Sequence, residues 1–586
     1  MPRLIGLLVL SAAVGVLRAE APAGDPVLDP AAAFVLKNFQ GDAQRGSVEA
    51  IDTPHGAGFR VTSGAASAFW HVALTTGDFQ PLRRGDVLLL TFHARTLRTA
   101  HESGAGQVTA FVQHNERPFD PSLMQEVSVG AQWTRVDLPF EVIRSYPPEL
   151  DQLTFGVGAA EQVVEIAGVQ LHRYPAGVAV RDLPMFRVTY AGREPDAPWR
   201  AAAQDRIARL RQSDLRLKVV DAAGQPVPGA KVEVRMRRHA FTFGAAIDAG
   251  LWTRDTTEAA RYRGHVRELF NAATIENHLK WSRWEDPPQR AAALRVLHEL
   301  RDAGLRARGH TLLWPSFAKS RVDLSAVKDD PAALAARIDG HVRDITDATA
   351  GLIAEWDVVN EPWNNHDFLD ILGRDAMAHW FRLARTQAPS ARLFINDFGI
   401  LVSPRPETDE HVAHYDQTIA YLLEQGAPVD AIGLQGHFGG PVPIATLQRT
   451  LDRFGRFGLG LAVTEYDLFT GDEVLAADFL RDLLTLVFSH ERAVGFTMWG
   501  FWDGNHWRGN APLFRKDWSA KPALEAYRDL VFRQWWTAAD ATTDAAGTAT
   551  VRAFHGDHRV TVTAPAGAIA TEVNVAGPAD VTVVLP

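Results

Sequence analysis

The sequence predicts a multidomain chain in which a (β/α)8 TIM barrel follows a β-sandwich and is flanked by pieces of a second, small β-sandwich. Apolar strands alternate with amphipathic helices through the middle of the chain, which is the pattern of a parallel barrel. Short strands divided by Gly, Asp and Pro turns fill the region before it, which is typical of a sandwich. The length of 586 residues leaves room for roughly three or four domains.

The composition indicates a folded protein and excludes several kinds of site. Hydrophobic residues make up 46% of the chain and charged residues 22%, which suits a sizeable core. The formal net charge of −10 argues against a nucleic-acid partner, since such a partner normally requires a basic patch. The chain has no Cys, so disulfides, thiolate metal sites and Cys nucleophiles are excluded.

The first residues have the pattern of a secretory signal peptide, which we place at residues 1–21. Arg3 supplies the positive end, residues 4–17 are apolar, and Ala19-Glu20-Ala21 offers a cleavage site with small residues. The apolar run is short for a membrane anchor. We therefore expect a secreted protein, extracellular or periplasmic, that has no contact with the membrane after cleavage.

The region from 25 to 175 is predicted to be a β-sandwich. Its apolar runs are short and are separated by turn residues, as several strands of a sandwich would be. A connector with Pro and Gly and a helical segment follow, and we assign them to a linker and helix at 176–213. The clearest predicted strands are 87–95, 107–114, 133–142 and 163–172.

Two separate regions, 214–238 and 538–586, share a β character. The first contains two alternating strands joined by a Gly/Pro turn, and two strands alone are barely stable. One hypothesis is that both regions form a single small β-sandwich into which the barrel is inserted. The alternative, that each region decorates its own neighbour, stays open.

The barrel is assigned to residues 239–537. Eight apolar runs alternate with helical segments such as 289–304 and 473–490, as a (β/α)8 barrel requires. The fold alone says nothing of the chemistry, because such barrels host many reactions. The predicted strands are 241–247, 270–276, 305–314, 352–361, 391–397, 429–437, 460–465 and 494–500.

Polar and aromatic residues gather at the carboxyl ends of these strands, where barrel enzymes have their active sites. One polar strand end is usually a cap or a turn, but a ring of them at most strand ends predicts a functional site. The ring consists of Glu276, Asn277, His310, Trp314, Asn360, Glu361, Asn396, Asp397, Gln435, His437, Glu465 and Trp499.

Two of these residues, Glu361 and Glu465, follow the fourth and seventh strands on opposite sides of the barrel. A pair of carboxyl groups flanking one bond is the machinery of glycoside hydrolysis, in which one group gives a proton and the other stays ionised. A separation of about 5–5.5 Å would make the second group a nucleophile and would retain the anomeric configuration.

Several segments at the strand ends resemble the motifs of family-10 glycoside hydrolases, the endo-1,4-β-xylanases. WDVVNEP at 356–362 resembles the acid/base motif of that family, and TEYD at 464–467 resembles its nucleophile motif, usually TELD. The remaining matches follow in the order of the family and cover 240–530. They are 274-TIENHLKW-281, 308-RGHTLLW-314, 395-INDF-398, 432-IGLQGHF-438 and 497-TMWGFWDGNHW-507.

The resemblance implies a role for each matching residue and implies no metal or cofactor. Glu361 would be the general acid/base and Glu465 the nucleophile, with Asn360 bonded to the sugar 2-hydroxyl. His437, with Asp467 behind it, would keep the nucleophile ionised. The substrate-binding residues would be Glu276, Asn277 and Lys280 on the glycone side, His310 and Gln435 at the cleavage subsite, and Trp314, Trp499 and Trp507 as walls that stack on sugars.

The match has two departures. The family commonly continues WHSQ after the third strand, whereas this chain reads WPSF at 314–317, and Tyr466 replaces the usual Leu beside the nucleophile. Neither departure removes a catalytic carboxylate. They affect fine specificity and the binding of the substrate on the glycone side, and they leave the reaction type unchanged.

The resemblance predicts a retaining endo-1,4-β-xylanase that acts on xylan, and we expect the protein to be a monomer. Two alternatives remain: a retaining hydrolase of another β-glycan, and a non-catalytic polysaccharide-binding protein. The N-terminal sandwich resembles, more loosely, the carbohydrate-binding modules that precede such barrels. Trp70, Gln113 and Gln125 could face a sugar chain there, although a single aromatic residue in a sandwich is more often part of the core.

Overall fold

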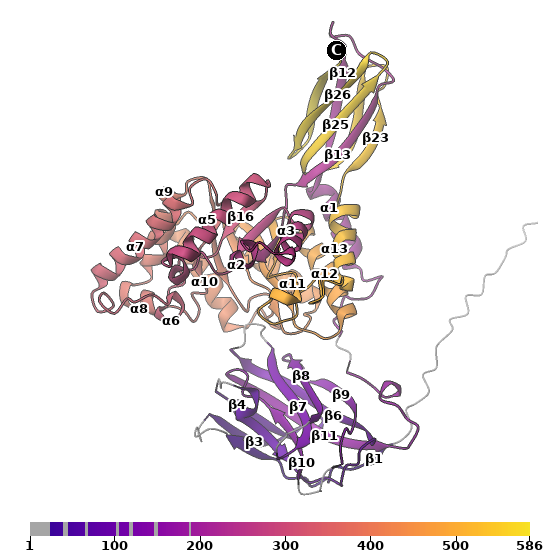
Figure 1. Cartoon of the computed structure of the whole chain (residues 1–586), viewed down its shortest axis with the longest axis vertical. Coiled ribbons are helices and arrows are strands. Elements are labelled where there is room, and N and C mark those ends of the chain that lie inside the picture. Colours follow the sequence, from indigo (N-terminus) through magenta and orange to yellow (C-terminus); the bar gives the residue numbers. More distant parts are fainter. Residues whose placement is uncertain are drawn as a thin grey trace, which may run out of the picture. The chain divides into compact units, whose positions relative to one another are not determined.

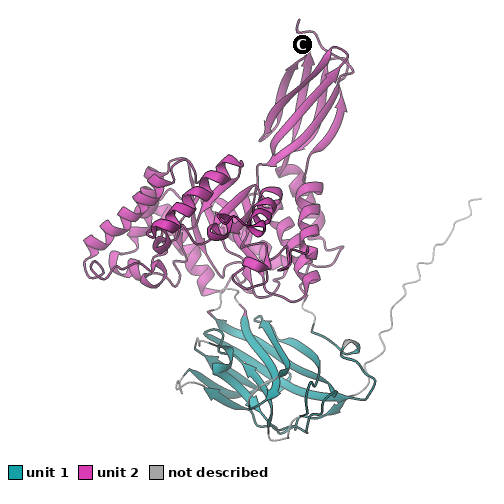
Figure 2. Ribbon diagram, viewed as in Figure 1, with its two compact units in different colours: residues 1–99, 106–186 teal, residues 100–105, 187–586 magenta. Residues whose placement is uncertain are grey.

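The computed structural model describes residues 24–38, 45–64, 68–100, 105–116, 121–145, 150–186 and 189–586. The predicted signal peptide at 1–21 lies outside the described residues. The chain divides into two compact units (Figure 2). Residues 1–99 and 106–186 form the first unit, and residues 100–105 and 187–586 form the second.

The first unit contains two sheets of mostly antiparallel strands. One has the order β3-β4-β11-β6-β9 with β1 paired to β11, and the other has the order β2-β5-β10-β7-β8. The strands are β1 Asp25–Pro26, β2 Val35–Asn38, β3 Gly46–Thr53, β4 Gly56–Ser63, β5 Val72–Thr76, β6 Val87–Thr99, β7 Gly106–His114, β8 Pro121–Val129, β9 Thr134–Glu141, β10 Asp151–Gly156 and β11 Gln162–Tyr174.

The core of this unit follows from the alternation of side chains along its strands. Leu88, Leu90 and Phe92 of β6 are buried with Val108 and Val112 of β7, which belongs to the other sheet. Every second residue of a strand points to the same face, so one face of each sheet supplies the core. The predicted N-terminal β-sandwich is confirmed.

The second unit contains a closed barrel of eight parallel strands within the continuously described residues 189–586 (Figure 1). The strand order runs β19-β18-β17-β16-β15-β14-β22-β21, and pairing of β19 with β21 closes the ring. The barrel strands are β14 Thr242–Ile247, β15 Ala272–Ile275, β16 Arg306–Gly309, β17 Glu355–Asn360, β18 Arg392–Asp397, β19 Ala431–Leu434, β21 Gly460–Leu468 and β22 Ala493–Met498, with the short β20 His437–Phe438 beside β21.

Helices lie between the strands, and several begin at an aspartate that caps the first turn. Asp330 accepts hydrogen bonds from two backbone N–H groups of α7, and Asp409 and Asp472 do the same for α10 and α12. The longer helices are α3 Thr257–Leu269, α5 Pro287–Asp302, α7 Pro331–Ala348, α9 Asp375–Gln387, α10 Glu410–Glu424, α11 Ile444–Gly455, α12 Glu473–Ser489 and α13 Pro522–Arg528. The shorter ones are α2 Ala249–Trp252, α4 Trp281–Trp284, α6 Phe317–Ser320 and α8 Asp367–Leu372.

Strands from before and after the barrel form one small sandwich. Figure 1 shows β12 and β13, which precede the barrel in sequence, between the yellow strands of the C-terminus. One sheet has the order β24-β12-β27 and the other β23-β13-β25-β26, with a shared core of valines and leucines. The strands are β12 Gln212–Val220, β13 Lys231–His239, β23 Ala538–Thr542, β24 Thr548–Phe554, β25 Gly556–Ala564, β26 Gly567–Val575 and β27 Ala579–Val584.

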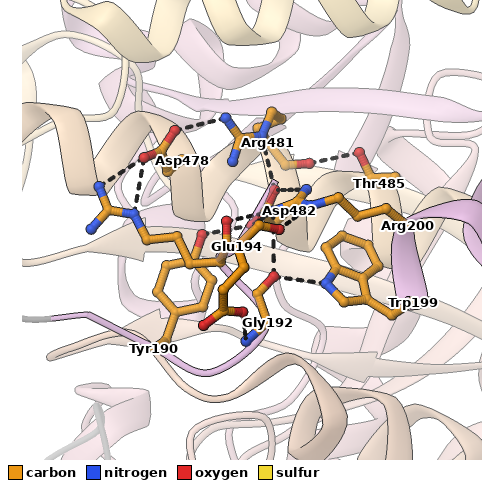
Figure 3. Close-up of polar contacts among 10 residues, drawn as sticks. Tyr190, Gly192, Glu194, Trp199, Arg200, Asp478, Arg481, Asp482 and Thr485 are labelled. Atoms are coloured by element: carbon orange, nitrogen blue, oxygen red, sulfur yellow. Dashed lines mark hydrogen bonds and ion pairs between the residues drawn. The ribbon is translucent and has the colours of Figure 1, made fainter. Parts of the chain in front are cut away.

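The segment that leads into this unit is anchored to helix α12 by a buried aspartate (Figure 3). Asp482 is fully buried and accepts hydrogen bonds from the Tyr190 hydroxyl at 2.8 Å and from Arg200 at 2.7 Å. The Trp199 indole, at the start of α1 Trp199–Leu210, donates to the carbonyl of Gly192 at 2.7 Å. The linker is therefore packed onto the barrel helices.

The predicted fold class, a barrel with a preceding β-sandwich, is confirmed by these sheets. In the described part of the chain, the helices all fall short of the length and apolar character that a membrane span requires.

Candidate active site

The carboxyl ends of the barrel strands bring the predicted site residues into one region of the second unit. Asn360 ends β17 and Glu361 follows it, while Glu465 and Asp467 lie near the end of β21. The others come from the loops or strand ends on either side. His310 and Trp314 follow β16, Glu276, Asn277 and Lys280 follow β15, Gln435 and His437 follow β19, and Trp499 and Trp507 follow β22.

Glu361 is buried, with 5% of its surface exposed, and its backbone has φ = 54°. A left-handed conformation is uncommon for a non-glycine residue, and Pro362 restricts it further. Hydrogen bonds hold this conformation, because the Glu361 N–H donates to the carbonyl of Asn396 at 2.8 Å. The side chain accepts from the amides of Gln435 at 2.8 Å and Asn365 at 3.4 Å.

Glu465 is also buried, but its partners differ in charge from those of Glu361. His437 Nε2 lies 3.1 Å from Oε2, and the Asn396 amide donates to Oε1 at 2.8 Å. His310 Nδ1 lies 4.0 Å from Oε1. Burial raises the pKa of Glu465, but the His437 hydrogen bond, the nearby imidazoles and Asn396 outweigh it, so the pKa lies below its usual value.

His437 is held between two carboxylates. Its Nδ1 lies 3.0 Å from Oδ2 of Asp467, which also accepts from the Trp507 indole at 2.7 Å. Burial lowers the pKa of His437, but the charge of Asp467 and the hydrogen bonds to Asp467 and Glu465 raise it to about 10. Burial raises the pKa of Asp467, whereas His437 and Arg508 lower it to about 2. An imidazolium between two carboxylates is therefore the stable state near neutral pH.

Gln435 forms hydrogen bonds with both glutamates. Its side-chain amide donates to Glu361, and its backbone carbonyl accepts from the Glu465 N–H at 2.8 Å. Asn396 forms a second bridge, because its amide donates to both Asn360 Oδ1 and Glu465 Oε1 at 2.8 Å. The Thr464 hydroxyl donates to Asn396 Oδ1 at 2.7 Å and so fixes which end of that amide faces the carboxylate.

His310 is positioned by an aspartate inside the fourth barrel strand. Its Nδ1 lies 3.0 Å from Oδ2 of Asp357, and Arg308 contacts the other oxygen of the same carboxylate. The imidazole lies edge-on to Trp499, with ring centroids 5.1 Å apart, and to Trp314 at 6.2 Å. Through His310, the indoles of Trp499 and Trp314 are thus connected to the carboxylate of Asp357.

Lys280 joins the residues after β15 to this set. Its Nζ donates to Asn277 Oδ1 at 3.1 Å and lies 5.4 Å from the ring of Trp314. Burial lowers the pKa of Lys280, although Glu276, Glu465 and Glu361 act in the opposite direction. Burial likewise raises the pKa of Glu276, against the charge of Lys280.

Several buried polar atoms of the site have no hydrogen-bond partner within the described part of the chain. They include Nδ2 of Asn360, Oε1 of Gln435 and Nε1 of Trp314. An unsatisfied buried donor or acceptor is costly, so such atoms mark positions where a polar ligand or water completes the site. Trp507, which is 47% exposed, offers a flat apolar face at the same end of the barrel.

The model of glycosyl hydrolase family 10 matches residues 233–530, which is half of the chain and includes every residue of this site. The chain belongs to this family. The match begins within β13 and ends within the last helical segment, so it covers the whole barrel.

Curated relatives of this family-10 chain carry different names. The anti-sigma-I factor RsgI6 of Acetivibrio thermocellus is 32% identical over 379 residues, 63% of this chain and 47% of that protein. Endo-1,4-beta-xylanase 1 of Arabidopsis thaliana is 28% identical, with 60% of this chain and 37% of that protein covered. Endo-1,4-beta-xylanase 3 of Hypocrea jecorina is 29% identical, with 50% and 82% covered. The match thus spans less than half the length of the first two.

Among solved structures, native xylanase 10B from Thermotoga maritima is 22% identical with a TM-score of 0.45, covering 50% of this chain and 96% of that one. The structure of GH10 from Paenibacillus barcinonensis is 25% identical with a TM-score of 0.43, covering 50% and 94%.

Tyr466 and the WPSF segment at 314–317, the two departures from the family's common motifs, are each packed against other parts of the barrel domain. Tyr466 is buried and packs against Phe496, with ring centroids 5.2 Å apart, on the side of β21 away from Glu465. Phe317 packs edge-on against Phe368 at 5.0 Å, and its N–H donates to Asp367 at 3.0 Å. The WPSF segment is therefore held by contacts with α8 rather than left loose.

Four further residues contact the predicted site residues, and the sequence alone indicates no individual role for any of them. Asn396 stood in the ring of polar strand ends, but only the fold reveals that its amide reaches Glu465 and Asn360. Asp357 lies in the WDVVNEP motif and Thr464 in the TEYD motif, and the sequence pattern predicts only that both are residues inside a strand. Asn365, four residues after Glu361, reaches back to it through a turn that carries no local signal in the sequence.

Proposed function

We propose that this chain is a retaining endo-1,4-β-xylanase that hydrolyses internal linkages of xylan by double displacement, with Glu361 as acid/base and Glu465 as nucleophile. The observation that carries the proposal is the unequal environment of the two buried carboxyl groups. His437 and His310 lie beside Glu465 and favour its ionised form, whereas the neutral amides of Gln435 and Asn365 donate to Glu361. Such a difference supports Glu361 as the acid and Glu465 as the nucleophile.

In the first step, a Glu465 oxygen attacks the anomeric carbon and forms an ester bond. At the same time Glu361 gives its proton to the glycosidic oxygen, and the bond from that oxygen to the anomeric carbon breaks. The aglycone leaves as an alcohol, and Glu361 is left as a carboxylate. The imidazolium of His437 stabilises the Glu465 carboxylate before the attack and is released from part of that interaction as the ester forms.

In the second step, Glu361 takes a proton from water while the water oxygen attacks the anomeric carbon. The ester bond to Glu465 breaks, and Glu465 returns as a carboxylate. Two inversions restore the original configuration, and Glu361 is again protonated for the next cycle. Gln435 contacts both glutamates and so keeps their relative position through both steps.

The surrounding residues take the substrate-binding roles. The free Nδ2 of Asn360 is suited to the sugar 2-hydroxyl, a contact that strengthens in the transition state. Asp467 orients His437, and Lys280, with Glu276 and Asn277, binds the next sugar on the glycone side. His310 and Gln435 line the cleavage subsite. The walls that stack on sugar faces are Trp314, Trp499 and Trp507.

Xylan as the substrate is supported by the curated relatives named as endo-1,4-beta-xylanases. The site also suits a neutral polysaccharide, which offers hydroxyl groups and apolar CH faces to polar side chains and aromatic walls. The chemistry as proposed needs no metal or cofactor, and the protein acts as a monomer. A retaining hydrolase of another β-glycan is the alternative enzyme, and the relative amounts of reducing ends released from xylan and from glucan separate the two.

We further propose that the protein is secreted after removal of residues 1–21, for which the N-terminal sequence pattern is the support. The domain limits follow the sequence assignment: a sandwich at 25–175, a linker and helix at 176–213, a barrel at 239–537, and a small sandwich from 214–238 with 538–586. The pairing of β12 and β13 with the C-terminal strands supports the last of these.

The N-terminal sandwich is proposed to bind the polysaccharide. Trp70 is 48% exposed, and an exposed indole face suits stacking on a sugar. In affinity electrophoresis on soluble xylan, the full-length Glu465→Gln protein should be retarded, and adding Trp70→Ala should reduce the retardation. Equal migration of the two proteins would count against this role.

The main test is NMR product analysis with xylan, which reports substrate, endo action and anomeric outcome together. At early times we expect oligosaccharides of mixed length whose new reducing ends have the β configuration. Glu465→Gln should abolish hydrolysis while leaving binding intact, and Glu491→Gln, which alters an exposed glutamate outside the site, should not change it. Turnover by Glu465→Gln at the wild-type rate would refute the nucleophile, and binding without any hydrolysis by the wild type would favour a non-catalytic polysaccharide-binding protein.

A further inference from the structure

Lys280 and Lys319 both lie close to the indole of Trp314, but they differ in their charged neighbours. Lys319 Nζ lies 4.6 Å from the centre of the Trp314 ring, and Lys280 Nζ lies 5.4 Å from it. Both distances are in the range of a cation–π contact, which holds an ammonium group over the face of an aromatic ring. Trp314 thus gathers two positive charges at the proposed glycone side of the site.

The charge of Lys280 is already balanced. Glu276, Glu465 and Glu361 all act on it electrostatically, and its Nζ donates to Asn277. Lys319 is exposed and, in the continuously described residues 189–586, makes no ion pair with a carboxylate within 4.0 Å. Lys319 is therefore a cation beside the site that has no carboxylate counter-charge within 4.0 Å among residues 189–586.

The position of Lys319 is fixed by the short helix α6, Phe317–Ser320. The Ser320 hydroxyl donates to the carbonyl of Trp314 at 3.0 Å, which ties the end of the helix back to the tryptophan. Asp367 accepts from the Phe317 N–H at 3.0 Å at the other end. The carboxylate of Asp367 is thus engaged with the backbone, and the lysine is presented beside Trp314 by an anchored segment.

We propose that Lys319 and the face of Trp314 form a subsite for an acidic sugar, a uronic acid carried as a side group on the glycone part of the chain. This inference rests on the proposed function, which places Trp314 against the glycone. A neutral xylose unit offers nothing to an ammonium group beyond a hydroxyl, whereas a uronate offers a carboxylate. A charge-assisted hydrogen bond from Lys319 to that carboxylate, with the sugar ring against the indole, uses both features of the subsite.

The test compares two substrates, a linear β-1,4-xylo-oligosaccharide and the same oligosaccharide with one glucuronic acid side group. The measured quantity is the ratio of kcat/KM for the acidic substrate to kcat/KM for the neutral one. Because an exposed ion pair contributes little, we expect Lys319→Met to lower this ratio by about threefold. Lys319→Arg should keep the ratio, and about 1 M NaCl should reduce the wild-type ratio, since the Debye length there is about 3 Å.

The matched control is Lys328→Met, which removes an exposed lysine from the same loop, nine positions further along the chain. Its ratio should equal that of the wild type. A second readout is the position of the uronate in the products, which should lie on the fragment that carries the new reducing end. An unchanged ratio in Lys319→Met, or a uronate found only on the other fragment, would overturn the subsite. If the wild type hydrolyses neither substrate, the proposed function itself fails.

Discussion

The imidazole of His437 lies 3.1 Å from the carboxylate of Glu465, and both side chains are buried. Burial lowers the pKa of His437, but Asp467, the second carboxylate on the imidazole, and Glu465 together raise it to about 10, which keeps a positive charge beside Glu465. A buried carboxyl group would otherwise be protonated more easily than in water. The proposed nucleophile is therefore ionised because of its neighbour rather than because of exposure to solvent.

Replacing His437 by Gln should shift the acid limb of the pH–activity profile to higher pH. The folded-state pKa of Glu465 lies below its usual value, and burial alone would raise it. Loss of the imidazolium removes the hydrogen bond and the charge of His437, so only His310 and Asn396 still act against burial, and the pKa of Glu465 rises. More of the nucleophile is then protonated at a given acidic pH. The measurement is kcat/KM against pH from about 4 to 8, with His379→Gln, an exposed histidine of α9, as the control. An acid limb at the wild-type position would contradict the assigned role of His437.

The barrel could be predicted from the sequence because each of its strands is an apolar run followed by a helical pattern. Glu361 and Glu465 could be predicted as a pair because both follow such runs, and strand ends of a barrel meet at one edge. The pairing of β12 with both β24 and β27 was only one of two hypotheses, because local patterns do not say which distant strands share a sheet.

The contacts that connect the site could not be predicted in the same way. Asn396 of β18 reaches Glu465 of β21 across the intervening strand β19, and Asn365 reaches Glu361 through a turn, so neither partnership follows from spacing along the chain. The φ of 54° at Glu361 was equally hidden, because a glutamate before a proline carries no signal for a left-handed backbone. Such details depend on how the finished barrel places its loops.

Gly433→Ala should impair both activity and stability. Gly433 lies in β19, and a Cβ added there would overlap with Oδ1 of Asn396 and lie 2.9 Å from its Cγ. Asn396 would have to move away from Glu465 and Asn360, which it bridges. Overpacking of this kind costs about 1–3 kcal/mol of folding free energy.

The measurement is kcat/KM on xylan together with the urea midpoint for loss of activity. We expect kcat/KM to fall at least about tenfold, since the nucleophile loses one hydrogen bond and its position. The matched control is Gly471→Ala, because a Cβ at that glycine meets no atom within 4 Å. Wild-type activity in Gly433→Ala would argue that Asn396 does not hold Glu465.

Asp482→Asn should loosen the linker from helix α12. The carboxylate is fully buried and accepts from Tyr190 and Arg200, so removal of its charge leaves Arg200 without its ionic partner, whereas Arg481 loses one ion pair and keeps the one with Asp478. Both arginines are partly exposed and can be solvated, which limits the loss to about 1–3 kcal/mol. The urea midpoint for loss of activity should fall, whereas kcat at 25 °C should stay near the wild-type value. Asp529→Asn, which alters an exposed pair with Arg533, should leave the midpoint unchanged.

Glu361→Ala should separate substrates by their leaving groups. When xylan is cleaved, its aglycone part would leave as an alkoxide unless the glycosidic oxygen is protonated. Loss of the acid should therefore lower kcat on xylan by about 10²–10⁴-fold. The aryl group of an activated aryl xylobioside leaves as a stable phenolate and needs no proton. The first step of hydrolysis of this substrate should therefore proceed near the wild-type rate. Its second step lacks the base, and the glycosyl–enzyme ester on Glu465 should accumulate, visible as a burst of phenol.

Azide distinguishes this mechanism from a general loss of structure. It is an anion that attacks the ester without giving up a proton, so it should restore turnover in Glu361→Ala and yield a β-glycosyl azide. Glu410→Ala, which alters an exposed glutamate in the first turn of α10, should show neither the burst nor the rescue. Equal losses on xylan and on the aryl substrate, with no response to azide, would remove Glu361 from the acid/base role. Because the β configuration of the azide requires attack on an α-linked ester, the same product also reports on Glu465 as the residue that carries the sugar between the two steps.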